Sequence, residues 1–373
     1  MKKTLFFLLC IVNMGCELEK QKMTIDWKIG STLPESNGIE NIGVAGPITG
    51  IIEDKLIIIG GANFPDKKPW EGGIKSYQKE LYIYQILNEG QFKLLKQENF
   101  SDSIAYAANV SFDNKIISVG GERNGIATKD VYQITLQNDS IVINTLPSLP
   151  EGLTNGSAAV VGDYLYLVGG ENAEHVSNKI LRLHLDNLSN GWEEFADLPY
   201  AVSHSVAVNL DNQRLVIIGG RKRNLNAKSD IYDDVIVIDV KDKSIRNLPN
   251  MSEPLAAGTA VNYNGNLIVI GGDNGETFHK VEEYIADIHT TDDEAIKNKL
   301  ITEKNSLQSS HPGFSKKVWM LSKGSKEWKA LNDLNHESPV TTTALLINNK
   351  IILPSGEIKA GVRTNQILIG EIR

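Results

Sequence analysis

A strand-like apolar segment that ends in a glycine pair recurs along this chain, and this repeat limits the possible folds more than any other feature. The first glycines of the pairs fall at positions 60, 120, 169, 219 and 271, in the segments KLIIIGG, KIISVGG, YLYLVGG, RLVIIGG and NLIVIGG. The steps between them are 60, 49, 50 and 52 residues. A period of about 50 residues is typical of propellers and related repeat proteins. A sixth copy, KIILPSG, ends at Gly356 and has serine before the glycine.

Each unit contains the residues for four antiparallel strands. A run of small residues such as TNGSAAVV comes first, and an Asn-, Asp- or Gly-rich turn separates it from the Gly-Gly strand. A branched or aromatic strand such as DVIVIDV follows, and then a fourth strand that often contains Trp, as in GWEEFADLP. Small residues fit a crowded inner strand, and glycine permits positive φ where backbones pack closely. We therefore predict an all-β fold, a six-bladed kelch-type β-propeller.

The sixth unit begins near Val340 and lacks a fourth strand of its own. A fourth-strand sequence without preceding strands, TIDWKIGSTLP, lies at residues 24–34 and contains Trp27. We expect this N-terminal strand to close the last blade. Closure of the ring in this way removes the exposed edges that an open sheet would present.

The first sixteen residues resemble a bacterial lipoprotein signal peptide. Lys2 and Lys3 precede a short apolar run, LFFLLCIV, which is too short for a transmembrane helix. Gly15-Cys16 matches a lipoprotein cleavage junction, although Asn13 stands where leucine is usual, which leaves ordinary secretion open. We expect residues 17–373 to form the propeller. We also expect it to be exported to the periplasm and attached to the cell envelope through lipid on Cys16.

Composition excludes several classes of partner and cofactor. The chain has 38 basic and 46 acidic residues, and removal of Lys2 and Lys3 changes the net charge from −8 to −10. This acidity argues against nucleic acid as a ligand. Both cysteines, Cys10 and Cys16, lie in the leader, so the rest of the chain has no thiolate ligand or disulfide. The seven histidines show no metal-binding spacing, and we expect neither a metal nor another cofactor.

One long insertion interrupts the fifth unit at about residues 273–317. The segments VEEYIADI and DDEAIKNKLI within it have helical periodicity and good helix-forming residues. We predict a helical insertion in the fifth blade. It is either a surface decoration or a lid over one end of the channel, since long loops in compact domains are often functional.

Four segments carry a resemblance to a known family over residues 24–373. They are GVAGPITGIIEDKLIIIGGANFP, SIAYAANVSFDNKIISVGGE, the insertion after Gly272, and SGEIKAGVRT near the C-terminus. The last is the most specific, because the family pattern is close to NGE-x-K-x-G-x-RT and only Ser355 departs from it. The chain resembles the N-acetylneuraminate epimerase (sialic acid mutarotase) family of kelch propellers. The order of the segments further indicates a circularly permuted member, cut inside the catalytic blade.

The resemblance implies an isomerase that interconverts the α and β anomers of N-acetylneuraminate and supports sialic acid uptake. By that resemblance Glu357 is the proton acceptor, and Arg363 lies in the same pocket. Mutarotation moves one proton from the anomeric hydroxyl and another to the ring oxygen, which a single positioned carboxylate can do. Arg363 offers a planar fork suited to the carboxylate of a sugar acid.

Further candidates for contacts with the sugar follow the glycine pairs or lie near them. They are Asn63, Trp70, Glu122, Arg123, Glu171 and Arg221, with Asp273 at the equivalent position of the fifth unit. Arg123 and Arg221 would add positive charge for an anionic ligand, and Trp70 could stack on a sugar ring. His175, five residues past a glycine pair, is the histidine to check for exposure to the pocket. A structural role in turns or between blades is the competing interpretation for each.

Two other functions remain open from the residues alone. A lipid-anchored propeller could bind a glycan or a partner protein without catalysis. Glycoside hydrolysis would need two opposed carboxylates, for which Glu122 or Glu171 could join Glu357. The sequence lacks the Asp-box repeats of sialidases, which disfavours hydrolysis.

Overall fold

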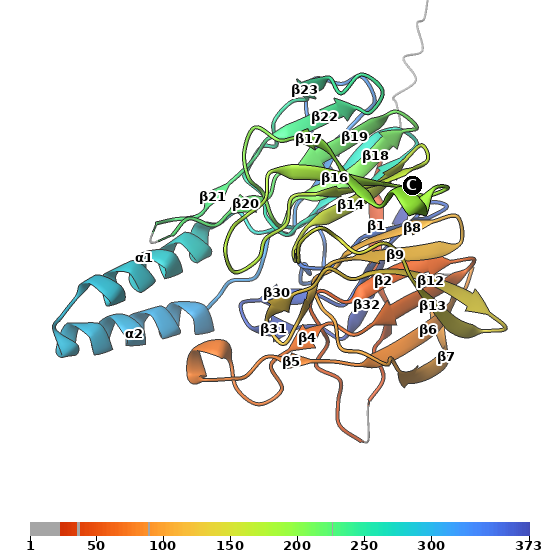
Figure 1. Ribbon diagram of the computed structural model, residues 1–373. Coiled ribbons are helices and arrows are strands. Elements are labelled where there is room, and N and C mark those ends of the chain that lie inside the picture. Colours follow the sequence, from red (N-terminus) through yellow and green to blue (C-terminus); the bar gives the residue numbers. More distant parts are fainter. Residues whose placement is uncertain (1–22, 36–37, 89, 226) are drawn as a thin grey trace, which may run out of the picture.

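The computed structural model describes residues 23–35, 38–88, 90–225 and 227–373. The predicted leader and Cys16 lie outside the described residues. The described chain folds into six four-stranded antiparallel sheets, whose inner strands contact one another in a closed ring (Figure 1). The prediction of a six-bladed β-propeller is therefore confirmed.

Each blade is built from four strands, numbered here from the inner to the outer edge. Blade 1 contains β2 (Ile48–Ile52), β3 (Lys55–Ile59), β6 (Glu80–Ile86) and β7 (Phe92–Asn99); blade 2 contains β8 (Ala108–Phe112), β9 (Lys115–Val119), β12 (Val131–Gln137) and β13 (Ser140–Thr145); blade 3 contains β14 (Ser157–Val161), β15 (Tyr164–Val168), β16 (Lys179–His184) and β17 (Trp192–Asp197). Blade 4 contains β18 (Val206–Asp211), β19 (Arg214–Ile218), β22 (Val235–Asp239) and β23 (Ile245–Asn247); blade 5 contains β24 (Thr259–Tyr263), β25 (Asn266–Ile270), β26 (Val318–Leu321) and β27 (Lys329–Ala330); blade 6 contains β28 (Leu345–Ile347), β29 (Lys350–Pro354), β32 (Gln366–Ile372) and β1 (Ile25–Thr32).

Short elements extend from the end of the blades where the glycine pairs lie. Four two-stranded ribbons are β4 (Ala62–Asn63) with β5 (Ser76–Tyr77), β10 (Glu122–Arg123) with β11 (Ile126–Ala127), β20 (Arg221–Lys222) with β21 (Asp230–Ile231), and β30 (Glu357–Lys359) with β31 (Val362–Arg363). The helical elements at this end are the 3-10 turn η1 (Pro69–Glu71) and the α-helices α1 (Glu276–Thr290) and α2 (Glu294–Ser309). The 3-10 turn η2 (Leu188–Asn190) connects β16 and β17 at the opposite end of blade 3.

The N-terminal strand closes the ring as predicted. β1 pairs antiparallel with β32 from Ile25 opposite Ile372 to Thr32 opposite Gln366. Thr24 and Arg373 exchange two backbone hydrogen bonds of 3.0 and 2.9 Å at the end of this pairing. Trp27 is buried between blades 5 and 6. The two ends of the propeller sequence thus complete one blade.

The apolar core of the described chain consists of six clusters, each between two neighbouring blades. Alternate residues of a second strand face opposite clusters, as the period of a strand requires. In β3, Leu56 and Ile58 pack toward blade 6, whereas Ile57 and Ile59 pack toward blade 2. Tryptophans near the outer edge also join blades: the indole N–H of Trp192 donates to the Pro147 carbonyl at 2.8 Å, and that of Trp328 donates to the Pro249 carbonyl at 2.7 Å.

A ring of six backbone hydrogen bonds encircles the axis where the inner strands begin. Each blade contributes one residue with φ between +52° and +61°, and each of these residues donates its N–H to the carbonyl of the equivalent residue one blade back. The distances range from 2.7 to 3.2 Å, and the residues of this axial ring are Gly46, Tyr106, Asn155, His204, Ala257 and Thr341. A channel of about 410 Å³, lined by the inner strands, runs away from the ring.

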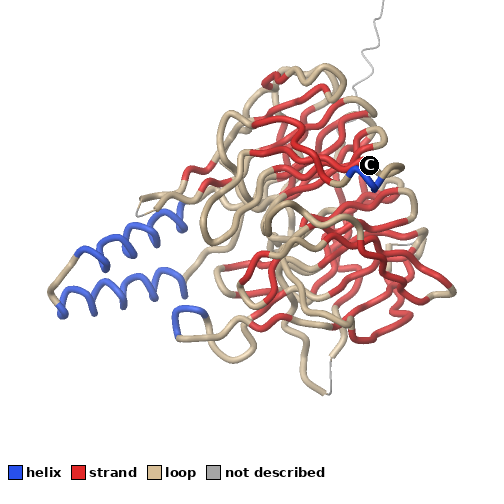
Figure 2. Tube along the Cα trace, in the orientation of Figure 1, coloured by secondary structure: helices blue, strands red, loops and turns tan. Residues whose placement is uncertain are grey.

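The insertion forms an antiparallel pair of helices, which confirms the predicted helical character. Figure 2 shows α1 and α2 extending away from the sheets as a hairpin. No residue of either helix is buried, so the hairpin adds little to the propeller core. No helix in the described chain has the length and apolarity to cross a membrane.

Candidate active site

The glycine pairs place one residue of each blade around the mouth of the propeller. The residue after each pair forms a single antiparallel bridge to the residue just before the axial ring. These six mouth positions, in blade order, are Ala62, Glu122, Glu171, Arg221, Asp273 and Glu357. Residues at the same place in each repeat therefore lie at the same place in each blade, and four of these six carry a carboxylate at one opening.

Blade 6 reaches this geometry with serine where the other blades have glycine. Ser355 has φ +58°, a conformation that costs an L residue about 1–2 kcal/mol. At the first glycine of the other five pairs, a Cβ would lie 2.0–2.7 Å from a neighbouring atom. The buried Ser355 hydroxyl instead accepts the Val44 N–H at 2.9 Å and lies 2.7 Å from the Thr364 carbonyl. Its hydrogen bonds tie the Glu357 turn to blade 1.

The spacing of the Glu and Arg motif follows from a tight ribbon. Glu357 and Arg363 lie directly opposite each other in the pairing of β30 with β31. The Glu357 Oε1 atom accepts the Gly361 N–H at 2.7 Å and Arg363 Nη1 at 3.1 Å. Oε2 makes no hydrogen bond to any residue in the described chain. One carboxylate oxygen is thus fixed and the other is left for a ligand.

Burial raises the pKa of Glu357 above its ordinary value of 4.5, although the Arg363 charge and the Gly361 N–H act in the opposite direction. The Glu357 side chain is 19% exposed, so it is covered by protein but still open to the mouth. A carboxyl group with a raised pKa can both accept and return a proton near neutral pH. This environment suits general acid-base chemistry.

Arg363 is held against Glu357 rather than presented to solvent. Its side chain is only 4% exposed, its Nε donates to the Ala62 carbonyl at 3.3 Å, and its guanidinium lies 4.9 Å from the Phe64 ring centre. Tyr106 of the axial ring also interacts with Arg363. Burial raises the pKa of Tyr106, so its hydroxyl stays protonated as a hydrogen-bond donor.

Glu122 anchors the neighbouring side of the mouth. Its Oε1 accepts Tyr77 Oη at 2.6 Å and Lys75 Nζ at 2.9 Å. Lys75 also lies 5.0 Å above the Tyr106 ring, and its charge acts on Glu357. Lys75 therefore places a second positive charge near the carboxylate of blade 6.

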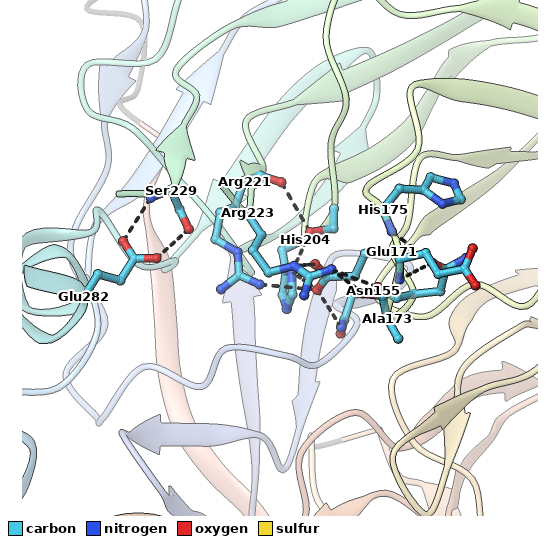
Figure 3. A network of polar contacts seen from close by, with 12 residues as sticks. Asn155, Glu171, Ala173, His175, His204, Arg221, Arg223, Ser229 and Glu282 are labelled. Carbon is cyan, nitrogen blue, oxygen red and sulfur yellow. Dashed lines mark hydrogen bonds and ion pairs between the residues drawn. The ribbon is translucent and has the colours of Figure 1, made fainter. Parts of the chain in front are cut away.

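Glu171 lies in a more loosely bonded network on the far side (Figure 3). Its Oε1 is 3.2 Å from Arg221 Nη2, 3.2 Å from Asn155 Nδ2 and 3.6 Å from His204 Nδ1. Burial, followed by the nearby Arg221 charge, lowers the pKa of His204 well below 6.5. His204 is therefore neutral in the folded protein at neutral pH.

Each of the other predicted site residues is held by its own contacts with neighbouring residues. Asn63 is buried, and its amide bridges the Gly43 carbonyl and Gln78. Arg123 forms ion pairs with Asp102, in the connection between β7 and β8, and with Asp130, just before β12. Trp70 donates its indole N–H to Ser309 of α2 at 3.1 Å. His175 lies 3.5 Å from Glu151, and Asp273 accepts the Gly275 N–H at 2.9 Å.

Sequence reasoning missed the axial-ring side chains and Lys75. The ring residues Tyr106, Asn155 and His204 occupy the same place in each repeat, in the triplets AYA, TNG and SHS. A polar or aromatic residue between small ones at this place was the available signal. Among the described residues, no group of three or more His, Asp or Glu is arranged to hold a metal ion.

Fold and site together define a six-bladed propeller with a ring of carboxylates at its axial mouth, of which Glu357 is fixed by Arg363 within one ribbon. The chain belongs to the N-acetylneuraminate epimerase family, whose sequence model matches residues 14–143 and 146–373. The predicted circular permutation of the chain order is not tested by this match and stays a prediction.

Individual relatives carry the same name. The N-acetylneuraminate epimerase of Salmonella enteritidis is 28% identical over 225 residues, which cover 60% of this chain and 57% of the relative. That of Vibrio cholerae is 25% identical over 232 residues, covering 60% and 58%. The matches thus span less than two thirds of each relative. The solved structure titled "Structure of YjhT" is similar in fold, with a TM-score of 0.62 and 16% identity over 92% of this chain and all of that one.

Proposed function

We propose that this protein is a mutarotase that interconverts the α and β anomers of N-acetylneuraminate. Glu357 Oε2 takes the proton of the anomeric hydroxyl, the protonated carboxyl gives a proton to the ring oxygen, and the ring C–O bond opens. The open keto form rotates and recloses with the proton transfers reversed. The sugar is neither oxidised nor reduced, and atoms are conserved. Arg363 and Lys75 supply positive charge beside Glu357 for the sugar carboxylate.

One observation carries this proposal: Glu357 lies at the mouth, 19% exposed, with Oε1 bonded twice and Oε2 left open. This geometry fixes the direction of the basic atom, and burial raises its pKa toward the working range of a general base. Family membership supplies the substrate class.

The anomerisation rate tests the proposal directly. A sialidase releases one anomer, and proton NMR follows its relaxation with and without the protein. We expect acceleration by the wild type and a loss of about a hundred- to ten-thousandfold in Glu357→Gln. Relaxation at the buffer rate with wild-type protein would contradict the activity. Full activity in Glu357→Gln would contradict the assignment of the base.

We also propose that the protein acts outside the cytoplasm in support of sialic acid uptake, anchored through lipid on Cys16. The support is the leader sequence described above, which lies outside the described residues. Mass spectrometry of the purified protein should show diacylglycerol on Cys16, and Cys16→Ala should move the protein from the membrane to the soluble fraction. An unmodified Cys16 in the membrane fraction would contradict the anchor.

A further inference from the structure

The mouth has a second polar centre opposite the base. In the blade order around the ring, Glu171 of blade 3 lies three blades from Glu357 of blade 6. A ligand that crosses the mouth with one end at Glu357 therefore has its other end near Glu171. Nothing in the proton transfers described above uses this second centre.

The polar and basic groups around Glu171 lie farther from its carboxylate than those that bind Glu122. Glu122 accepts bonds of 2.6 and 2.9 Å, whereas the donors around Glu171 lie at 3.2 to 4.0 Å, with Arg223 Nε the farthest. Charge-assisted hydrogen bonds prefer about 2.7–2.9 Å, so the contacts of Glu171 are longer than optimal and its donors are not fully used by it. The buried Arg221 Nε has no partner among the described residues. Donors exceed acceptors at this point.

The helical insertion covers the same centre. Phe278 of α1 lies 5.1 Å from the Arg221 guanidinium, which packs over its ring. α1 is fixed there because Glu282 accepts the N–H and the hydroxyl of Ser229 at 3.0 and 2.6 Å (Figure 3). The centre thus combines a carboxylate, two guanidiniums and an aromatic face, which suit vicinal hydroxyls and the carbon chain that bears them.

We propose that Glu171, Arg221 and Arg223 bind the hydroxylated tail of the sugar acid and select sugars long enough to cross the mouth. The inference rests on the proposed function for the orientation of the sugar. Glu171 accepts hydroxyl protons, the two arginines donate to hydroxyl oxygens, and Phe278 covers the carbon chain. The insertion is then part of the binding site.

A truncated substrate tests this subsite. Mild periodate oxidation and borohydride reduction of an N-acetylneuraminate glycoside, followed by hydrolysis of the glycosidic bond, give a sugar with a shortened tail, a free anomeric centre and an intact carboxylate. We expect Glu171→Gln and Arg223→Gln to raise KM for the full-length sugar about 10- to 100-fold, the effect of one hydrogen bond to a charged group. KM for the truncated sugar should stay unchanged in these variants.

Lys222→Gln is the matched control, because it removes a positive charge from the same ribbon at a side chain that is 42% exposed and 3.8 Å from Asp230. It should behave as wild type, and thermal melts should show all variants folded. Equal effects on the two sugars, or no effect on either, would overturn the inference. If wild-type protein accelerates neither sugar, the proposed function fails, and calorimetric affinities of the same variants for the two sugars decide the inference alone.

Discussion

At the scale of the residue, Arg363 acts on Glu357 through both position and charge. Its Nη1 fixes Oε1 at 3.1 Å, and its charge opposes the burial that raises the Glu357 pKa. In the proposed mechanism the base form of Glu357 is the active one. Activity should therefore fall as pH drops through a pKa that lies above the ordinary 4.5.

Loss of the Arg363 charge should shift the acid limb of the pH profile, the range over which activity falls as the pH is lowered. Arg363→Gln removes the largest of the interactions that oppose burial, so we expect the acid limb of kcat/KM for anomerisation to shift to higher pH. Arg363→Lys keeps the charge but loses the planar fork, and its limb should shift less while kcat still falls. Profiles measured between pH 4 and 8 check both variants. An unchanged limb in Arg363→Gln would show that the guanidinium does not act on the base.

His204 should make the propeller sensitive to mild acid. Its pKa is well below 6.5 because of burial and then the Arg221 charge. The unfolded chain therefore binds a proton below about pH 6.5 that the folded protein excludes. The free energy of unfolding must then decrease as the pH is lowered below about 6.5, by up to about 1.4 kcal/mol per pH unit. Asparagine tolerates the φ of +54° at this position. In His204→Asn the urea concentration at the unfolding midpoint should therefore change less between pH 7 and 5 than in wild type. His175→Asn, at a side chain 45% exposed, should leave the slope of wild type.

At the scale of the element, the helical hairpin is held by a few polar contacts rather than by a core. Two residues of α1 contact Ser229 of blade 4. Glu282 accepts the Ser229 N–H and hydroxyl, and His279 Nε2 lies 2.9 Å from the Ser229 carbonyl. α2 reaches blade 1 through Ser309 and Trp70. The hairpin therefore links two separated blades across one side of the mouth.

Breaking the Glu282 contact should release α1 without unfolding the blades. Hydrogen exchange of residues 276–290 should accelerate about tenfold or more in Glu282→Gln, because a charge-assisted acceptor for two donors is lost, while exchange in β25 stays slow. Glu283→Gln is the matched control, since Glu283 only forms an exposed ion pair with Lys228. The same acceleration in both variants would show that the Ser229 contact does not hold the helix.

What could be predicted from the sequence was local. The glycine pairs and small-residue runs define the blades, and the six-residue spacing of Glu357 and Arg363 places them opposite each other in one ribbon. Contacts between blades were not accessible, because partners such as Glu171 and Arg221 lie 50 residues apart and meet only through the rotation of neighbouring sheets. Asn63 comes one residue after Ala62, the mouth position of blade 1, yet its amide donates to the Gly43 carbonyl and not toward the mouth.

At the scale of the whole molecule, no blade depends on being first in the chain. Six similar clusters join neighbouring blades, and the pairing of β1 with β32 contributes the same kind of contacts as the continuous blades. The stability of the ring then follows from closure, whichever exposed connection between strands is cut. This equivalence is what would allow family members to differ in chain order.

A rearranged chain tests that argument. Thr24 and Arg373 exchange two backbone hydrogen bonds, so a short Gly-Ser linker can join them, and new termini can be opened between Asn138 and Asp139 in the exposed turn of β12 and β13. We expect a melting temperature within a few degrees of wild type and unchanged anomerisation, because the cut breaks no blade interface. Opening between Ile217 and Ile218, both buried in β19, should abolish folding. If the first permutant also failed to fold, the covalent order of the blades, and not closure of the ring, would hold the propeller together.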